Sequence, residues 1–201
     1  MIQKPIAQQL LCAAFSLWLC AIPAASAAAS ADLPRSSVYQ LDVGLTDQDG
    51  QASRWRDGVN PVGGPRIVGM FYSRCDYVCP MLFEAVKNIE ASLPAPARDR
   101  MQVGLITLDP ARDDTAALKK TALQRAGDPA RWHLYRTQAA DVRKLAGVLG
   151  VQYRQLSNGE FNHSTLMILL DSQGVELART EQIAKIDPIF VKAVIKASAR
   201  P

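Results

Sequence analysis

Two cysteines separated by three residues, Cys75 and Cys79, are the side chains of this 201-residue chain best suited to chemistry. A cysteine thiolate is both a nucleophile and a metal ligand. The C-x3-C spacing places the two sulfurs within one helical turn, with Cα atoms about 6 Å apart, which suits a disulfide or two ligands on one ion. The pair therefore predicts either a redox-active site or a metal site.

The segments on either side of the cysteines predict how they are positioned. A continuous apolar run from Ile67 to Tyr72 is typical of a strand buried on both faces. Pro80 opens a helix, whose apolar stripe consists of Phe83, Val86, Ile89 and, less regularly, Leu93. The cysteines then lie at the carboxyl end of a strand, where open α/β sheets bind ligands, and at the amino end of a helix, whose dipole favours a thiolate.

The histidines decide which metal the pair could hold. Zinc would require four ligands, and the chain has no second C-x-x-C. Two cysteines and one histidine suit copper better, because Cu(I) is soft and accepts few ligands. His133 lies within a predicted strand, Trp132–Tyr135, and is expected to be a packed or surface residue. His163 lies in a predicted loop beside the cysteine end of the sheet, and its spacing alone leaves its role open.

The first 31 residues differ from the rest of the chain. Lys4 is their only charged side chain, and a 13-residue apolar core runs from Leu10 to Ile22. This length is typical of a signal peptide and short of the roughly 20 residues of a membrane-spanning helix. Ala25-Ser26-Ala27 provides an A-x-A cleavage site, so residues 1–27 are predicted to be a signal peptide. The alternative is an uncleaved anchor; a lipoprotein is disfavoured, because no small residue precedes Cys20 directly.

Export changes the meaning of the cysteine count. Cys12 and Cys20 leave with the signal peptide, and the remaining 174 residues retain Cys75 and Cys79. The chain is then expected in the periplasm, or anchored to the inner membrane and facing the periplasm if the segment is not cleaved. In that oxidising compartment two nearby cysteines usually form a disulfide. One short-loop disulfide adds little to a domain of this size, so the pair calls for a chemical explanation.

Composition and charge exclude several classes of protein. Hydrophobic residues make up 48% and charged residues 21% of the chain, which argues against a disordered protein and a polytopic membrane protein. The formal charge is +4, but 23 basic residues are interleaved with 19 acidic ones. A nucleic-acid-binding protein normally concentrates its basic residues, so no nucleic-acid partner is expected.

The remaining pattern predicts a fold. Residues 28–37 form a flexible lead, and residues 38–201 form one domain that begins with a hairpin over Val38–Trp55. Strands then alternate with helices until a closing hairpin, Leu166–Leu170 with Val175–Thr180, and a last helix that starts at Asp187 and Pro188. This order predicts an α/β, thioredoxin-like fold: a central mixed sheet flanked by helices, with an added N-terminal β-hairpin.

Four motifs in order resemble those of the SCO (SenC/PrrC) family of thioredoxin-fold copper proteins, over roughly Leu41 to the C-terminus. The first is C-x3-C-P, ending at Pro80, and the second is D-P-x-R-D over Asp109–Asp113. The third is His163-Ser164, and the fourth is an L-x-D-x-x-G ending over Leu169–Gly174. His163 follows Cys79 by 84 residues, close to the family spacing.

The resemblance implies that copper, as Cu(I) or Cu(II), is bound by Cys75, Cys79 and His163. It also implies a role in assembling the binuclear copper site of cytochrome c oxidase, with that enzyme's copper-site subunit or another periplasmic copper protein as partner. Two departures concern the site. Asp76-Tyr77 follows the first cysteine where the family commonly has Pro-Asp, and Asn162 replaces an aspartate that would help to orient the histidine.

Two questions stay open at the level of the sequence. Asp109 follows a predicted strand and either faces the site behind the metal ligands or is a turn residue that caps Pro110. The protein is either a metallochaperone or a thiol–disulfide oxidoreductase that cycles Cys75 and Cys79 with a redox partner. A third option is a binding module in which the two cysteines form a structural disulfide. No proline occurs between Pro129 and Pro188, so the chain lacks the cis-proline typical of thioredoxin-like oxidoreductases, which favours the chaperone.

Overall fold

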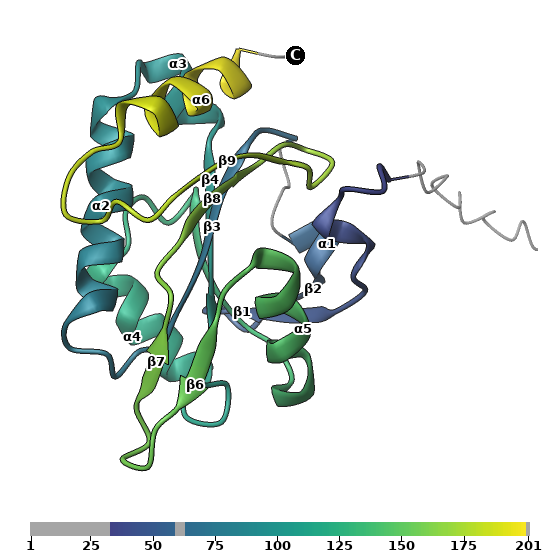
Figure 1. Ribbon diagram of the computed structural model, residues 1–201, viewed down its shortest axis with the longest axis vertical. Coiled ribbons are helices and arrows are strands. Elements are labelled where there is room, and N and C mark those ends of the chain that lie inside the picture. Colours follow the sequence, from purple (N-terminus) through teal and green to yellow (C-terminus); the bar gives the residue numbers. More distant parts are fainter. Residues whose placement is uncertain (1–32, 59–62, 200–201) are drawn as a thin grey trace, which may run out of the picture. The chain divides into compact units, whose positions relative to one another are not determined.

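Three parallel strands form the centre of the sheet: β3 (Arg66–Phe71), β4 (Gln102–Thr107) and β5 (Trp132–Arg136) (Figure 1). Every residue of β3 and β4 is buried, as the continuous apolar runs predict. The computed structural model describes residues 33–58 and 63–199. The predicted signal peptide, residues 1–27, and the first part of the lead lie outside the described residues.

Antiparallel strands complete the sheet, whose order is β2-β1-β5-β4-β3-β8-β9. On one side, β1 (Gly44–Asp47) pairs with β5 and forms a hairpin with β2 (Ala52–Arg54). On the other side, β8 (Met167–Leu170) pairs with β3 and with β9 (Glu176–Thr180). The mixed sheet and its N-terminal hairpin are therefore confirmed.

Helices cover the two faces of this sheet, and each face has its own apolar core. One core joins α2 (Val78–Ser92), α4 (Thr115–Arg125) and α6 (Pro188–Ser198) to the sheet. The other core contains α5 (Ala139–Leu149) and the N-terminal residues Tyr39 and Trp55. Strand β3 serves both, because Ile67 and Phe71 face the first core whereas Val68 and Met70 face the second.

Most helix ends follow their predicted signals. The carboxylate of Asp114 accepts the amide N–H of Ala117 at 2.8 Å and caps α4. Asp187 caps α6 in the same way, with Pro188 as the first helical residue. Three short elements were not predicted: a 3-10 turn (Val38–Gln40), α1 (Trp55–Gly58) and α3 (Ala95–Arg100).

A second, two-stranded sheet corrects one prediction. Residues 158–164 were expected to form a loop, but Phe161–His163 form strand β7, which pairs antiparallel with β6 (Tyr153–Gln155). The turn between the strands contains Gly159 at φ 82°, a conformation that glycine adopts without strain. His163 is therefore the last residue of a strand. Among the described residues, no helix is both long and apolar enough to cross a membrane.

Candidate metal centre

The two cysteines lie where the sequence predicts, between the end of β3 and the first turn of α2. The amide N–H of Cys79 points at the Sγ atom of Cys75 at 3.3 Å, and the amide of Cys75 donates to the carbonyl of Tyr72 at 3.3 Å. Both cysteines are free thiols and buried, with 6% of Cys75 and 1% of Cys79 exposed. The guanidinium of Arg125, from α4, donates to the carbonyl of Cys75 at 3.3 Å and holds this turn from the other side.

His163 reaches the cysteines from the hairpin β6–β7. Its Nε2 atom lies 3.9 Å from Sγ of Cys79, and its Nδ1 atom lies 3.1 Å from the carbonyl oxygen of Ser164. A carbonyl oxygen can only accept, so Nδ1 must carry the proton in this contact. Nε2 then presents a lone pair to the thiols, which is the state required of a metal ligand. The carbonyl of Ser164 takes the orienting role for which Asn162 lacks a carboxylate.

The ring of Tyr72 fixes the hairpin against the cysteine turn. Its hydroxyl donates to the carboxylate of Glu160 at 2.7 Å, and its ring packs edge-on against that of His163 with centroids 5.9 Å apart. The ring of Phe161 also packs against that of Tyr72, with ring centroids 5.3 Å apart. Three residues of the hairpin region thus depend on one side chain that directly follows β3.

The two thiols do not ionise alike. The pKa of Cys75 is lowered to about 3, chiefly because the thiol of Cys79 donates a hydrogen bond to it, while burial acts in the opposite direction. The backbone amides of Cys79 and Tyr77 also stabilise this thiolate. The pKa of Cys79 is raised by its hydrogen bond to Cys75 and by burial. Of the two thiols Cys75 is therefore the more acidic, and loss of the first proton hinders loss of the second.

Asp113 supports the cysteine turn from the end of β4. Its carboxylate is fully buried, and it accepts the amide of Ser73 at 3.0 Å together with the hydroxyls of Ser73 and Thr107. These bonds tie the residues before Cys75 to the neighbouring strand. In the sequence, Asp113 is marked only as the last residue of the D-P-x-R-D motif, and its supporting role becomes visible in the structure.

Asp109 belongs to a turn and does not line the cysteine hollow. Its carbonyl accepts the amides of Arg112 and Asp113, at 3.0 and 2.8 Å. Its carboxylate forms an ion pair with the Nε atom of Arg112 at 2.7 Å, and burial raises its pKa. The structure thus favours a role for Asp109 in the turn over a place facing the metal ligands. His133 is packed in β5 against Tyr135, with ring centroids 5.9 Å apart, and does not line the hollow either.

Access to the thiols is through a hollow of about 290 Å³ beside Cys75. Cys75 and His163 line it, whereas Cys79 lies behind them. Tyr77 stands at its rim with 80% of its surface exposed. The other lining residues come from the cysteine turn and the hairpin: Tyr72, Arg74, Asp76, Val78, Glu160, Phe161 and Asn162.

The arrangement can be compared with that of metal ligands. With bond lengths of about 2.3 Å to sulfur and 2.1 Å to nitrogen, two ligand atoms at a trigonal angle lie ~3.8 Å apart. The 3.9 Å between Sγ of Cys79 and Nε2 of His163 matches this separation. As they stand, no three His, Cys, Asp or Glu side chains in the described part of the chain are set to hold a metal ion. A metal held by Cys75, Cys79 and His163 would therefore require their side chains to adjust.

The fold and the site define a thioredoxin-like protein with a buried pair of thiols and an imidazole beside them. The family model SCO1/SenC matches residues 34–198, and the chain belongs to the SCO1/SenC family.

Three similar proteins show how far the likeness extends. A candidate copper-binding protein of Stutzerimonas stutzeri is 32% identical over 95 residues, which span 43% of this chain and only 41% of that protein. The copper-bound structure of Bradyrhizobium japonicum ScoI aligns with a TM-score of 0.65 and 20% identity, covering 78% of this chain and 98% of that one. BsSco, described as a member of the Sco family of cytochrome c oxidase assembly proteins, aligns with a TM-score of 0.69 and 16% identity, covering 85% and 98%. At these identities the two structures establish the fold.

Proposed function

We propose that this protein is a copper chaperone that holds one copper ion with Cys75, Cys79 and His163. The observation that carries the proposal is the imidazole. Its Nδ1 atom is engaged by the carbonyl of Ser164 while its Nε2 atom faces Sγ of Cys79 at 3.9 Å. Two thiols and one such nitrogen are a donor set that suits soft Cu(I).

The similar proteins support copper as the bound metal and cytochrome c oxidase as the client. A copper-bound structure exists for ScoI of Bradyrhizobium japonicum, and BsSco is described as a member of a family of cytochrome c oxidase assembly proteins. By this analogy the client is the subunit that carries the binuclear copper site of cytochrome c oxidase, or another periplasmic copper protein.

The site suggests how the ion is passed on. Cys75 lines the hollow and is the more acidic of the two thiols, so it is the first cysteine that copper meets. Cys79 must lose its proton when copper binds, because a metal ligand has to be deprotonated. A client thiolate that enters the hollow would approach from the side of Cys75 and His163. These two ligands would therefore be exchanged first, and Cys79 would release the copper last.

The N-terminal segment supports the periplasm as the compartment in which copper is exchanged. Residues 1–27 have the pattern of a signal peptide, and we assign the protein to the periplasm. An uncleaved segment would instead anchor it to the inner membrane, with the site on the periplasmic side.

Copper stoichiometry tests the ligand set. The reduced protein is titrated with Cu(I) and the bound metal is counted for wild type, His163→Ala and the matched control His133→Ala. We expect one tightly bound copper per chain in wild type and the control, and an affinity lowered ~100-fold or more in His163→Ala. Unchanged copper binding in His163→Ala would overturn the ligand set.

A thiol–disulfide oxidoreductase is the second candidate, favoured by the asymmetric ionisation of the pair. The thiolate of Cys75 would attack a substrate disulfide, forming a mixed disulfide and releasing a substrate thiol. Cys79 would then attack Sγ of Cys75, releasing the second substrate thiol and leaving a Cys75–Cys79 disulfide. Rapid turnover of a disulfide substrate by the copper-free protein, in the presence of a thiol reductant, would favour this function.

A further inference from the structure

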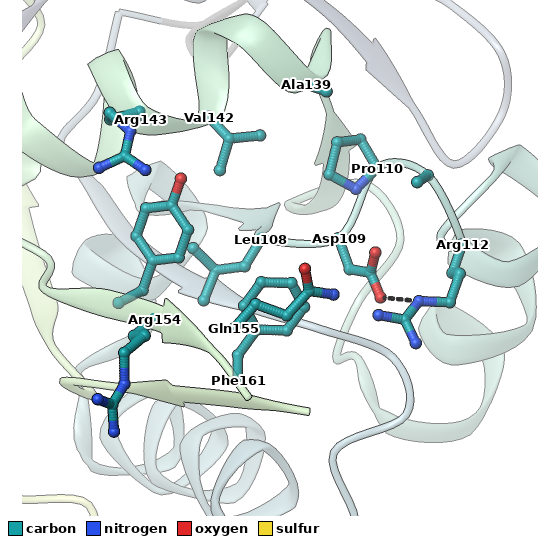
Figure 2. Close-up of a pocket in the computed structure, with 12 residues that line it drawn as sticks. Leu108, Asp109, Pro110, Arg112, Ala139, Val142, Arg143, Arg154, Gln155 and Phe161 are labelled. Atoms are coloured by element: carbon teal, nitrogen blue, oxygen red, sulfur yellow. Dashed lines mark ion pairs between the residues drawn. The ribbon is translucent and has the colours of Figure 1, made fainter. Parts of the chain in front are cut away.

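An open cavity of about 780 Å³ lies beside the cysteine hollow and is bordered by α5, β6 and the turn that follows β4 (Figure 2). Phe161 lines both spaces and is the wall between them. Nothing in the copper site uses this cavity. It is lined by Leu108, Asp109, Pro110, Ala111, Arg112, Ala139, Val142, Arg143, Tyr153, Arg154, Gln155 and Phe161.

The charge around the cavity is positive. Three arginines line it against a single carboxylate, that of Asp109, which is already paired with Arg112. Figure 2 shows Arg112 and Arg143 on opposite sides of the space. Within the described residues, neither Arg143 nor Arg154 has a carboxylate partner; the guanidinium of Arg143 lies over the ring of Tyr153 at 5.9 Å. Two cations, one on each side of β6 in Figure 2, are thus available to the carboxylates of an incoming ligand.

The backbone of β6 offers a second kind of contact. In the hairpin the amide of Leu156 donates to Glu160 and the amide of Ser164 donates to Gln152. Because inward and outward backbone groups alternate along an antiparallel strand, the N–H and C=O groups of Tyr153 and Gln155 point away from β7. Strand β6 pairs only with β7 among the described strands, so this edge is open. All three residues of β6 line the cavity.

We propose that this cavity is the docking groove for an extended, acidic peptide segment of the protein that exchanges copper with the site. The segment adds as a third strand to β6, and its carboxylates pair with Arg143 and Arg154. Strand addition supplies affinity through main-chain hydrogen bonds, and the arginines supply selectivity for acidic sequence. This inference rests on the proposed function, since Phe161 places a docked segment next to the hollow of Cys75.

Binding of a defined peptide to the reduced, metal-free full chain tests the charge. The probe is a fluorescently labelled hexapeptide of four glutamates and two valines, followed by anisotropy, beside a matched peptide with lysine for glutamate. We expect only the acidic peptide to bind, and Arg143→Glu to weaken it ~10-fold or more. Arg98→Glu makes the same charge change on α3, away from the cavity lining, and should stay within ~2-fold of wild type. Equal weakening by the two variants would overturn the proposal, as would full displacement of the peptide by equimolar free glutamate.

A proline substitution tests the strand addition separately. Gln155→Pro removes an amide that points away from β7, so it removes a donor to the docked segment and leaves the β6–β7 pairing intact. We expect it to weaken the acidic peptide ~10-fold, with Gln155→Ala within ~2-fold of wild type. Equal affinities for the proline and alanine variants would contradict an added strand.

Copper measurements keep this inference distinct from the proposed function. Arg143→Glu and Gln155→Pro should each still bind one copper per chain, which also shows that they are folded. A wild-type protein that binds the acidic peptide but no copper would overturn the proposed function alone. A wild-type protein that binds copper but not the acidic peptide would overturn the docking groove alone.

Discussion

At the scale of single residues, the position of the cysteine turn depends on a carboxylate that touches neither thiol. Asp113 is fully buried and receives three hydrogen bonds, from the amide and hydroxyl of Ser73 and the hydroxyl of Thr107. A buried carboxylate is tolerated only when its oxygens are satisfied in this way. Its removal would also leave two hydroxyls and an amide without their acceptor.

We therefore expect Asp113→Ala to lower the free energy of unfolding by ~3 kcal/mol, because buried donors lose their partner. Asp113→Asn keeps one acceptor oxygen and should cost less. The matched control is Asp114→Ala, which removes the exposed cap of α4 and should cost ~1 kcal/mol. Urea unfolding of the three variants measures the difference, and equal losses for Asp113→Ala and Asp114→Ala would count against the anchoring role.

The sequence alone predicts the position of the cysteines but not that of the histidine. The spacing of the cysteines and the strand before them predict where Cys75 and Cys79 lie, because both signals are local. The contacts that place His163 in the site are not local: Cys79 lies 84 and Tyr72 lies 91 positions before it in the chain. Contacts of this kind depend on how β3 and the hairpin meet in space. Only the resemblance to a family, and no periodicity, marks His163 in the sequence.

At the scale of elements, strand β7 is the part of the site that local pattern does not predict. The sequence indicates a strand over Val151–Leu156, which contains β6, whereas β7 has three residues and no apolar run long enough to indicate a strand. The hairpin is held in place by the hydrogen bond from the hydroxyl of Tyr72 to Glu160 and by the contact between the rings of Tyr72 and Phe161, which are tilted by 58° relative to each other. The long buried strands β3 and β4, by contrast, follow directly from their apolar runs.

The bond between Tyr72 and Glu160 should therefore matter more for copper than for stability. We expect Tyr72→Phe to lower copper affinity ~10-fold, because the hairpin that carries His163 is less firmly placed. The free energy of unfolding should fall by only ~1 kcal/mol. Tyr77→Phe removes a hydroxyl at an exposed rim position and should change neither quantity. Copper titration and urea unfolding of both variants provide the comparison, and an unchanged affinity in Tyr72→Phe would argue that the hairpin is held by other contacts.

Helix α5, which walls the proposed docking groove, ends at a glycine with a defined role. Gly150 has φ 70° and closes the helix in the left-handed region, where a Cβ is strained. Gly147 lies inside the helix, and a Cβ there would meet no atom within 4 Å. Gly150→Ala should destabilise the protein by ~1 kcal/mol, whereas Gly147→Ala should stabilise it by ~0.5–1 kcal/mol. Thermal unfolding shifts of the same sign in both variants would contradict this account.

At the scale of the whole molecule, function is concentrated at one end of the sheet. The thiols follow β3, the supporting Asp113 follows β4, and the hairpin brings His163 to the same place. The wall formed by Phe161 joins this site to the proposed groove. The remaining sheet is closed by an apolar core on each face. Substitutions in these cores and at Asp113 should therefore act on stability, and those of the thiols and His163 on binding.

The pH dependence of stability tests the environment of His133, whose ring packs against Tyr135 of the second core. Burial lowers the pKa of this imidazole below its usual 6.5, and Nε2 is buried without a hydrogen-bond partner in the described structure. Below about pH 6.5 the imidazole is protonated in the unfolded chain but still neutral in the folded chain. The free energy of unfolding therefore decreases as the pH is lowered, until the pKa of the folded state is reached. One such proton corresponds to a slope of up to ~1.4 kcal/mol per pH unit. Urea unfolding of the metal-free protein between pH 7.5 and 5.5 should show this loss in wild type and a flatter profile in His133→Phe. Parallel profiles would mean that the imidazole is protonated as readily in the folded state as in the unfolded chain.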